Sequence, residues 1–235
     1  KYRDIYPQEF YQKILDLGLC QAGQKVLDLG TGTGVLPRNL YQYGADFTGI
    51  DISGNQIGQA KRLAEEGRMN IQFQCIPAEK AGFPDGAFDV VTACQCFFYF
   101  KHEELSPLIH RILKESGTYM AWLPFEDEVA GKSEELVLKY NPKWTGCRER
   151  RHPIEIPEIY EEYFTIGEQT MFDVSVPFTR ESWNGRIRAC RGIGASLTPE
   201  ETERFDQEHR DLLNRIVPPE FEVLHYAAMA VLHKK

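Results

Sequence analysis

The order of apolar and polar positions along the chain predicts alternating strands and helices. Short apolar runs, typical of strands buried on both faces of a sheet, alternate with stretches of helical spacing as far as Leu123. The expected strands are Lys25–Leu29, Asp46–Asp51, Ile71–Cys75, Phe88–Ala93 and Gly117–Leu123, and the expected helices are Pro7–Leu17, Val35–Tyr43, Gln56–Glu66 and Glu103–Lys114. Units of this length predict an α/β fold, with a parallel sheet and helices on both of its faces.

The alternation stops at Pro124. From there to about Gly167 the chain contains several prolines and many aromatic residues, and it is longer than an ordinary connection, so we expect an irregular, lid-like insertion. The elements expected after it are a strand at Thr170–Phe178, helices near Arg180–Cys190 and Pro199–Ile216, and a long last strand at Phe221–His233. The prediction is a single domain over residues 1–235, with a core of about 20–123 and 168–235 and an insertion of about 124–167.

Composition narrows the class of partner. A chain of 235 residues with 42% hydrophobic and 26% charged residues can bury the core of one ordinary domain. Its formal charge of −8 and the lack of a Lys/Arg run argue against nucleic acid as a partner. No apolar run reaches the roughly 18 residues of a membrane helix, so we expect a cytoplasmic protein without a membrane partner.

The six cysteines are scattered, so free thiols are expected rather than a disulfide framework. Only Cys94 and Cys96 are closely spaced. A single C-x-C pair is weak support for a metal site, and alternate positions on a strand commonly carry small buried thiols, so no metal is predicted.

The most informative segment is Val26-Leu-Asp-Leu-Gly-Thr-Gly-Thr-Gly34, where three alternating glycines lie between an expected strand and an expected helix. Glycine allows a sharp turn and a close approach of the backbone to a ligand. In an open α/β sheet, ligands bind beyond the carboxyl ends of the strands near the point where strand order reverses. The loop is therefore expected to hold a cofactor.

The spacing of the glycines does not fit a dinucleotide fingerprint or a phosphate-binding loop. The third glycine of G-x-G-x-x-G would fall at Val35, and no Gly-Lys-Ser/Thr follows. S-adenosylmethionine (SAM) carries an ammonium and a sulfonium but no phosphate, so the carboxylate of Asp28 would complement it. Asp51 follows Asp28 by 23 residues and ends the next strand, where an acid can accept hydrogen bonds from both hydroxyls of an adenosine ribose.

These segments resemble the class I SAM-dependent methyltransferases, in the UbiE-like or type 11 group. The resemblance covers roughly Val26–Leu123 and includes four segments in the order of the family: Val26–Gly34, Gly49–Ser53, Ala78–Val91 and Arg111–Gly117. It implies a Rossmann-like, doubly wound sheet of seven mostly parallel strands with an antiparallel last strand. The implied cofactor is SAM, with S-adenosylhomocysteine (SAH) as product and a small molecule as methyl acceptor.

The resemblance also implies the cofactor-binding residues. Asp28, Gly30, Thr31, Gly32 and Gly34 would line the methionine part of SAM, and Asp51 would bind the ribose. Further cofactor contacts are implied for Ile52, Gln56, Ala78, Glu79, Cys94 and Gln95. Two departures from the family, Pro77 near the expected adenine site and Lys114-Glu-Ser-Gly117 before the fifth strand, leave the adenine contacts open.

The residues do not identify the acceptor or a catalytic group. Methyl transfer depends chiefly on alignment, and a general base is optional. Candidates by location alone are His102, Glu126, Asp127 and His152 as bases and Arg186, Arg188 and Arg191 as carboxylate binders, with Phe97–Phe100 and later aromatic residues as pocket walls. Core packing and surface ion pairs are the ordinary uses of such residues.

Three alternative functions stay open at this point. One is a nicotinamide-dependent oxidoreductase on a similar sheet. The second is a methyltransferase of arsenic or another thiophilic element that uses Cys94 and Cys96. The third is a SAM-binding regulator that transfers nothing.

Overall fold

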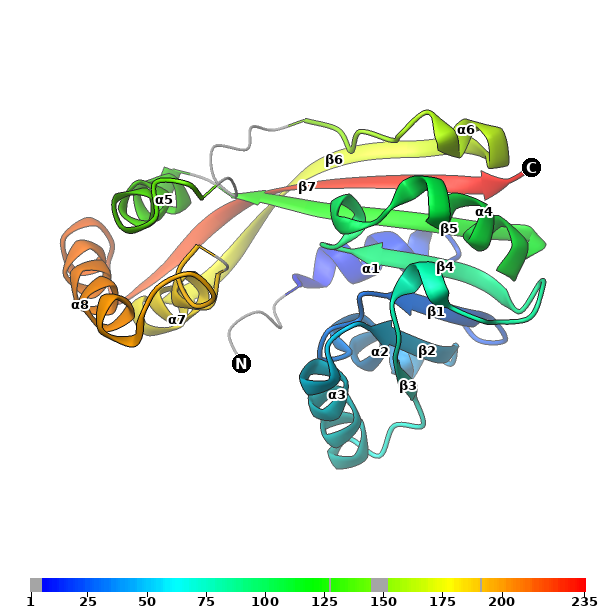
Figure 1. The fold of residues 1–235 in the computed structure, drawn as a ribbon, viewed down its shortest axis with the longest axis horizontal. Coiled ribbons are helices and arrows are strands. Elements are labelled where there is room, and N and C mark those ends of the chain that lie inside the picture. The colour runs from blue at the N-terminus through cyan, green and yellow to red at the C-terminus, as the bar shows by residue number, and fades with distance from the viewer. Residues whose placement is uncertain (1–5, 127, 145–151, 191) are drawn as a thin grey trace. The chain divides into compact units, whose positions relative to one another are not determined.

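The structure, a computed structural model, describes residues 6–126, 128–144, 152–190 and 192–235 (Figure 1). Its strands are β1 (Lys25–Leu29), β2 (Asp46–Asp51), β3 (Gln72–Cys75), β4 (Phe88–Cys94), β5 (Leu113–Glu126), β6 (Phe164–Thr179) and β7 (Glu220–Lys234). Its α-helices are α1 (Gln8–Asp16), α2 (Val35–Leu40), α3 (Gly54–Glu66), α4 (His102–Ile112), α5 (Glu128–Tyr140), α6 (Ile159–Tyr163), α7 (Arg180–Arg188) and α8 (Pro199–Ile216). Three short 3-10 helices are η1 (Tyr41–Tyr43), η2 (Ala78–Lys80) and η3 (Phe97–Tyr99).

The seven strands form one sheet in the order β3-β2-β1-β4-β5-β7-β6. β1 pairs in parallel with both β2 and β4, and β3 and β5 extend the parallel part on either side. β7 runs antiparallel to β5. The end of β7 accordingly lies beside the start of β5, where Lys234 Nζ donates a 2.9 Å hydrogen bond to the carbonyl of Leu113. The predicted Rossmann-like sheet with an antiparallel last strand is confirmed.

The centre of the sheet follows directly from the apolar run in β1. Val26, Leu27 and Leu29 are almost fully buried, as expected for a central strand that is covered on both faces. Leu29 pairs with Ile50 of β2 and with Ala93 of β4. The carboxyl ends of these three strands therefore lie side by side at the point where the strand order reverses, which is where open α/β sheets bind ligands.

The stretch after Pro124, which we expected to be irregular, contains the helices α5 and α6. The apolar pattern of α5 is hard to recognise, because its buried face includes Ser133 beside Ala130 and Val137. β6 also begins at Phe164, six residues before the predicted strand start at Thr170. Its first half contains Gly167, the charged Glu168 and several uncharged polar residues, which weakens the strand pattern.

The chain divides into two compact units, each described here by itself. We call residues 8–123, 152–171 and 228–235 the sheet unit, and residues 1–7, 124–151 and 172–227 the helical unit. The sheet unit contains β1 to β4 and the helices α1 to α4. The helical unit contains α5, α7 and α8 with parts of the long strands β6 and β7. The expected single domain and its insertion boundaries stay predictions.

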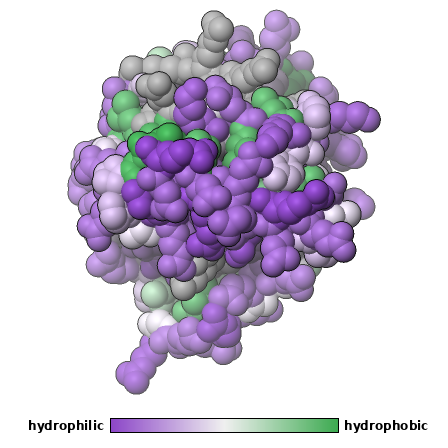
Figure 2. Space-filling view, turned by 90° about the vertical axis from the view of Figure 1, so that its left-hand side faces the viewer, coloured by the Kyte–Doolittle hydropathy of each residue, from purple (hydrophilic) through white to green (hydrophobic). Residues whose placement is uncertain are grey.

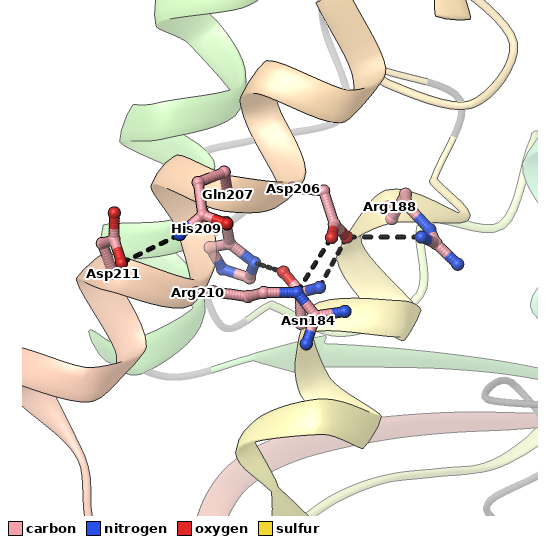
Figure 3. A network of polar contacts seen from close by, with 7 residues as sticks. All are labelled: Asn184, Arg188, Asp206, Gln207, His209, Arg210 and Asp211. Atoms are coloured by element: carbon pink, nitrogen blue, oxygen red, sulfur yellow. Dashed lines mark hydrogen bonds and ion pairs between the residues drawn. The ribbon is translucent and has the colours of Figure 1, made fainter.

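A buried polar chain connects the three helices of the helical unit. His209 of α8 is fully buried, and its Nδ1 lies 2.7 Å from Asn184 Oδ1 of α7. The Asn184 amide donates to Asp206, which also pairs with Arg188 and Arg210 (Figure 3). On the other side, His209 Nε2 lies 2.9 Å from Ser133 Oγ of α5.

The surface of this part of the molecule is mostly hydrophilic. Figure 2 shows the side that carries the labels α5, α7 and α8 in Figure 1, and hydrophobic residues occur there only as separate spots. Within the described ranges, no helix is both long and apolar enough to cross a membrane.

Candidate functional site

The loop between β1 and α2 contains three glycines with positive φ angles. Gly34 has a φ of +74°, and a Cβ atom there would lie 2.7 Å from the ring of Phe73. Gly32 has a φ of +57°, but a Cβ atom there would meet nothing within 4 Å. Gly34 is therefore required by packing inside the protein. At Gly32, by contrast, the backbone borders open space that a ligand can approach closely.

Asp51, at the end of β2, holds this loop in place. Its carboxylate accepts a hydrogen bond from Gly32 N at 2.9 Å and another from Ser53 N at 2.8 Å. A backbone bond of 2.9 Å from Thr31 N to Ile50 O joins the same two segments. The glycine loop and the strand-end acid, which were singled out separately in the sequence, thus form one constellation.

Asp28 lies beneath the loop rather than on its open side. Its side chain is 2% exposed and accepts a 2.7 Å hydrogen bond from Thr92 Oγ1 of β4. Burial raises the pKa of Asp28 to about 6, although the bond from Thr92 acts in the opposite direction. The nearby Asp51 carboxylate also contributes to raising this pKa. Because Asp28 is buried, we expect it to act on a ligand through its charge rather than through direct contact.

The chain after β4 turns sharply back against the glycine loop. Gln95 has a φ of +61°, a strained conformation for a residue other than glycine. The next residue, Cys96, donates from Sγ to Leu29 O at 3.1 Å, directly before Gly30. Strain of this kind is often found at functional sites, so the turn adds to the case for a site here.

The cysteines of this turn are held as neutral thiols. Burial raises the pKa of both Cys94 and Cys96 well above the ordinary value, and the Asp28 charge acts in the same direction. Thiolates are the form that binds metals and thiophilic elements. Among the described side chains, no group of three potential ligands is placed to hold a metal ion.

The residues expected to contact adenosine have different environments. Ile52 is 76% exposed, whereas Ala78 is buried. Gln56 lies in the first turn of α3, where its backbone N–H donates to the capping side chain of Ser53. The Glu79 carboxylate accepts a 3.1 Å bond from Lys101 N just before α4. The carboxylate of Glu79 is thus already engaged within the protein.

A family model described as a methyltransferase domain matches residues 26–117, which include all of the elements described above around the glycine loop. Over these residues, which make up less than half of the chain, it resembles the class I SAM-dependent methyltransferases. The match confirms the resemblance inferred from the glycine loop, Asp51 and the segments that follow them. It also favours this family over the nicotinamide-dependent alternative.

Individual relatives of the methyltransferase domain agree with this assignment. A ubiquinone biosynthesis O-methyltransferase of Bradyrhizobium sp. (strain ORS 278) is 29% identical over 152 residues, which are 61% of this chain and 58% of that protein. A demethylmenaquinone methyltransferase of Thermus thermophilus is 35% identical over 109 residues, which are 45% of this chain and 50% of that protein. The matched regions thus span about half of each relative.

The fold of the methyltransferase domain extends over most of the chain. The crystal structure of the YcgJ protein of Bacillus subtilis superimposes with a TM-score of 0.59 at 22% identity, covering 96% of this chain and 98% of that one. At this identity the likeness supports the fold alone.

The other candidate side chains have varied surroundings. Arg188 pairs with Asp206 at 3.4 Å, and the Arg186 guanidinium lies 5.7 Å from the centre of the Trp183 ring. His152 Nδ1 lies 2.6 Å from the carbonyl oxygen of Pro153. Of the candidates named from the sequence, Glu126, Asp127 and Arg191 lie outside the described side chains.

Sequence reasoning missed two features of the site. One is Thr92, whose hydroxyl bonds Asp28 although the two residues are 64 positions apart. The other is the hydrogen bond between His102 Nδ1 and Tyr160 Oη at 3.0 Å, made by residues 58 positions apart. Neither has a local signal, because both depend on how β1, β4, α4 and α6 pack together.

Proposed function

We propose that this chain is an enzyme that transfers a methyl group from SAM to a small-molecule acceptor. The observation that carries the proposal is the bond between Gly32 N and Asp51, which joins an open stretch of backbone to a strand-end carboxylate. The methyltransferase family match over residues 26–117 supports SAM as the methyl donor. SAH is then the second product.

The chemistry of these residues suits an adenosyl sulfonium. Each oxygen of Asp51 already accepts one backbone bond, but a carboxylate oxygen can accept a second, so both can take ribose hydroxyls. Exposed Ile52 offers an apolar surface to the adenine base. The remaining members of the proposed binding set are Asp28, Gly30, Thr31, Gly34, Gln56, Ala78, Glu79, Cys94 and Gln95.

Asp28 and Glu79 have indirect parts in this proposal. Asp28 is buried under the loop, so its charge would stabilise the cationic donor across a short, poorly screened distance. Glu79 would hold the start of α4 next to the adenine segment through its bond to Lys101 N. Both residues would therefore act on the site indirectly, Asp28 through its charge and Glu79 by positioning α4.

The donor supplies a methyl carbon that is attached to a good, neutral leaving group. The main task of the protein is therefore to fix the donor and to align an acceptor with that carbon, which can account for a large part of a rate enhancement. The Asp51 contacts and the bond from Cys96 Sγ to Leu29 O both limit movement of the cofactor loop. A general base is needed only if the acceptor loses a proton.

The acceptor class to test first is a phenol or quinol ring. One relative is named a ubiquinone biosynthesis O-methyltransferase, and another is named a demethylmenaquinone methyltransferase. Beside the site, Phe98 and Tyr99 are each about half exposed, with ring centroids 4.1 Å apart. Exposed rings of this kind offer stacking surfaces to an aromatic acceptor.

Calorimetry with SAM and with SAH tests the proposed donor site. The wild type should bind both ligands, and Asp51→Ala should weaken each at least tenfold, since it removes charge-assisted hydrogen bonds worth about 1.5–3 kcal/mol. Asp46→Ala is the matched control, because Asp46 lies exposed at the other end of β2. Failure of the wild type to bind either ligand would refute the proposal.

Turnover is tested by SAH formation from SAM with a panel of catechols, hydroquinones and simple amines. An acceptor-dependent signal that Asp51→Ala lowers supports an enzyme. Tight SAM binding with no turnover over the whole panel would favour a SAM-binding regulator instead.

A further inference from the structure

The residues that follow the turn after β4 return to the cofactor site. The Phe100 ring lies 4.0 Å from the position of a Cβ atom on Gly30. Lys101 N donates to Glu79, next to the expected adenine segment. Consecutive Cα atoms are about 3.8 Å apart. His102, the next residue and the first of α4, directly follows these two anchoring residues along the chain.

The imidazole of His102 is held in one orientation. Its Nδ1 lies 3.0 Å from the hydroxyl of Tyr160, a fully buried residue of α6. Its ring also packs against Phe97 of η3, with centroids 4.8 Å apart. The His102 side chain is only half-buried, and no described residue bonds its Nε2. Nε2 is thus the ring nitrogen that is available to a ligand.

The surroundings of His102 favour a neutral ring that can accept a proton at pH 7. Burial lowers the pKa of His102, while the charges of Glu103 on α4 and Glu79 on η2 act in the opposite direction. Tyr160 faces the ring from α6, and burial raises the pKa of Tyr160, so this neighbour stays neutral.

We propose that His102 is the acid–base residue of this site, with Nε2 facing the acceptor and Tyr160 as the residue that positions the ring. The proposal rests on the proposed methyl transfer. As the acceptor atom bonds the methyl carbon, the carbon–sulfur bond breaks and its electron pair goes to the sulfur. With Nδ1–H donating to Tyr160 Oη, the acceptor's proton passes to Nε2, and the imidazolium then releases it to water.

NMR titration of the His102 ring tests its location without any acceptor. If Nε2 faces the reacting methyl, the positive sulfonium of SAM should hold the His102 pKa lower than the neutral thioether of SAH does, by at least about half a unit. His110, near the other end of α4, is the internal control, and its ring signals should be the same in both complexes.

The possible outcomes of the titration are distinct. Equal His102 pKa values in the SAM and SAH complexes would overturn the acid–base proposal and leave the donor site intact. Failure to bind either ligand would overturn the proposed function, and this proposal with it.

Variants test the role of His102 in turnover with an acceptor from the panel. His102→Gln should lower kcat about 10²- to 10⁴-fold, the usual contribution of a general base, and leave SAM affinity unchanged. It should also remove the acidic limb of the pH–rate profile. Tyr160→Phe should lower kcat less and change the ratio of His102 tautomers in ¹⁵N spectra, while His110→Gln should do neither. Full activity of His102→Gln would contradict the proposal.

Discussion

At the scale of single residues, glycine is needed at Gly32 and at Gly34 for different physical reasons. The alternating spacing predicted the loop, and the structure shows that Gly34 is required by the Phe73 ring while Gly32 borders open space. The sequence could not distinguish these two cases, because Phe73 belongs to β3, which is distant along the chain. The same reasoning explains why the support of Asp28 by Thr92 was not predicted.

Gly32→Ala should separate binding from folding. The methyl group enters empty space, so the expected loss of stability is only the backbone strain, about 1–2 kcal/mol for a left-handed residue. SAM affinity should fall at least tenfold if the donor occupies that space. Thermal unfolding and calorimetry measure the two effects. Gly58→Ala, on the open surface of α3, is the control and should stabilise the helix without affecting binding.

Asp28 should make stability depend on pH. The folded-state pKa of Asp28, about 6, lies above the ordinary value of 3.8. The contribution of protonated Asp28 to folding stability is therefore fully present below pH 3.8 and is lost as the pH rises through 6. Asp28→Asn can still accept the Thr92 bond but has no charge. The free energy of unfolding of Asp28→Asn should exceed that of the wild type by on the order of 2 kcal/mol at pH 7.5 and by much less at pH 4.5, as measured by urea unfolding. A difference that is independent of pH would contradict the assignment.

At the scale of elements, the sequence predicted those whose apolar spacing is regular. β1, β2, β4 and α8 were all expected close to their observed bounds. α5 was missed because part of its buried face is polar, with Ser133 in place of an aliphatic residue. A buried serine is compatible with a helix only where its hydroxyl finds partners. Ser133 Oγ lies 3.2 Å from the carbonyl oxygen of Val129 in its own helix, and its other partners lie on α7 and α8.

Two buried serines in helices give a matched test of this argument. Ser133 Oγ accepts the Trp183 indole N–H at 3.0 Å and also bonds His209, whereas Ser106 Oγ of α4 has no hydrogen-bond partner among the described residues. Ser133→Ala leaves two buried groups unsatisfied and should cost about 2–3 kcal/mol. Ser106→Ala should change the free energy of unfolding by less than about 0.5 kcal/mol or increase it. Similar losses in both variants would refute this account.

At the scale of the whole molecule, the sheet was easier to predict than the helical unit. Parallel strands and crossover helices follow from a repeated local pattern that includes the cofactor loop and Asp51. The helical unit depends on contacts among α5, α7 and α8 that are far apart in sequence, such as Asn184 with His209. Its organisation therefore has no comparable local signature.

The two units should respond to mild acid in opposite directions. Burial lowers the pKa of His209 to about 4, below the ordinary 6.5, so its neutral form favours folding above pH 6.5 and this contribution is lost as the pH falls towards 4. Protonation would also oppose the bond from Ser133 to Nε2 and place an unpaired charge among α5, α7 and α8. Over the same range Asp28 becomes protonated, which favours the sheet unit.

Hydrogen exchange followed by mass spectrometry at pH 7.5 and pH 5, corrected for intrinsic rates, measures the two responses separately. Peptides from α5, α7 and α8 should lose protection worth on the order of 2 kcal/mol on acidification, while peptides from β1 and β4 keep or gain it. His209→Gln removes the titrating ring, so it should weaken the helical unit at pH 7.5 and make its exchange nearly independent of pH. Equal loss of protection in both units would mean that His209 does not control the acid response.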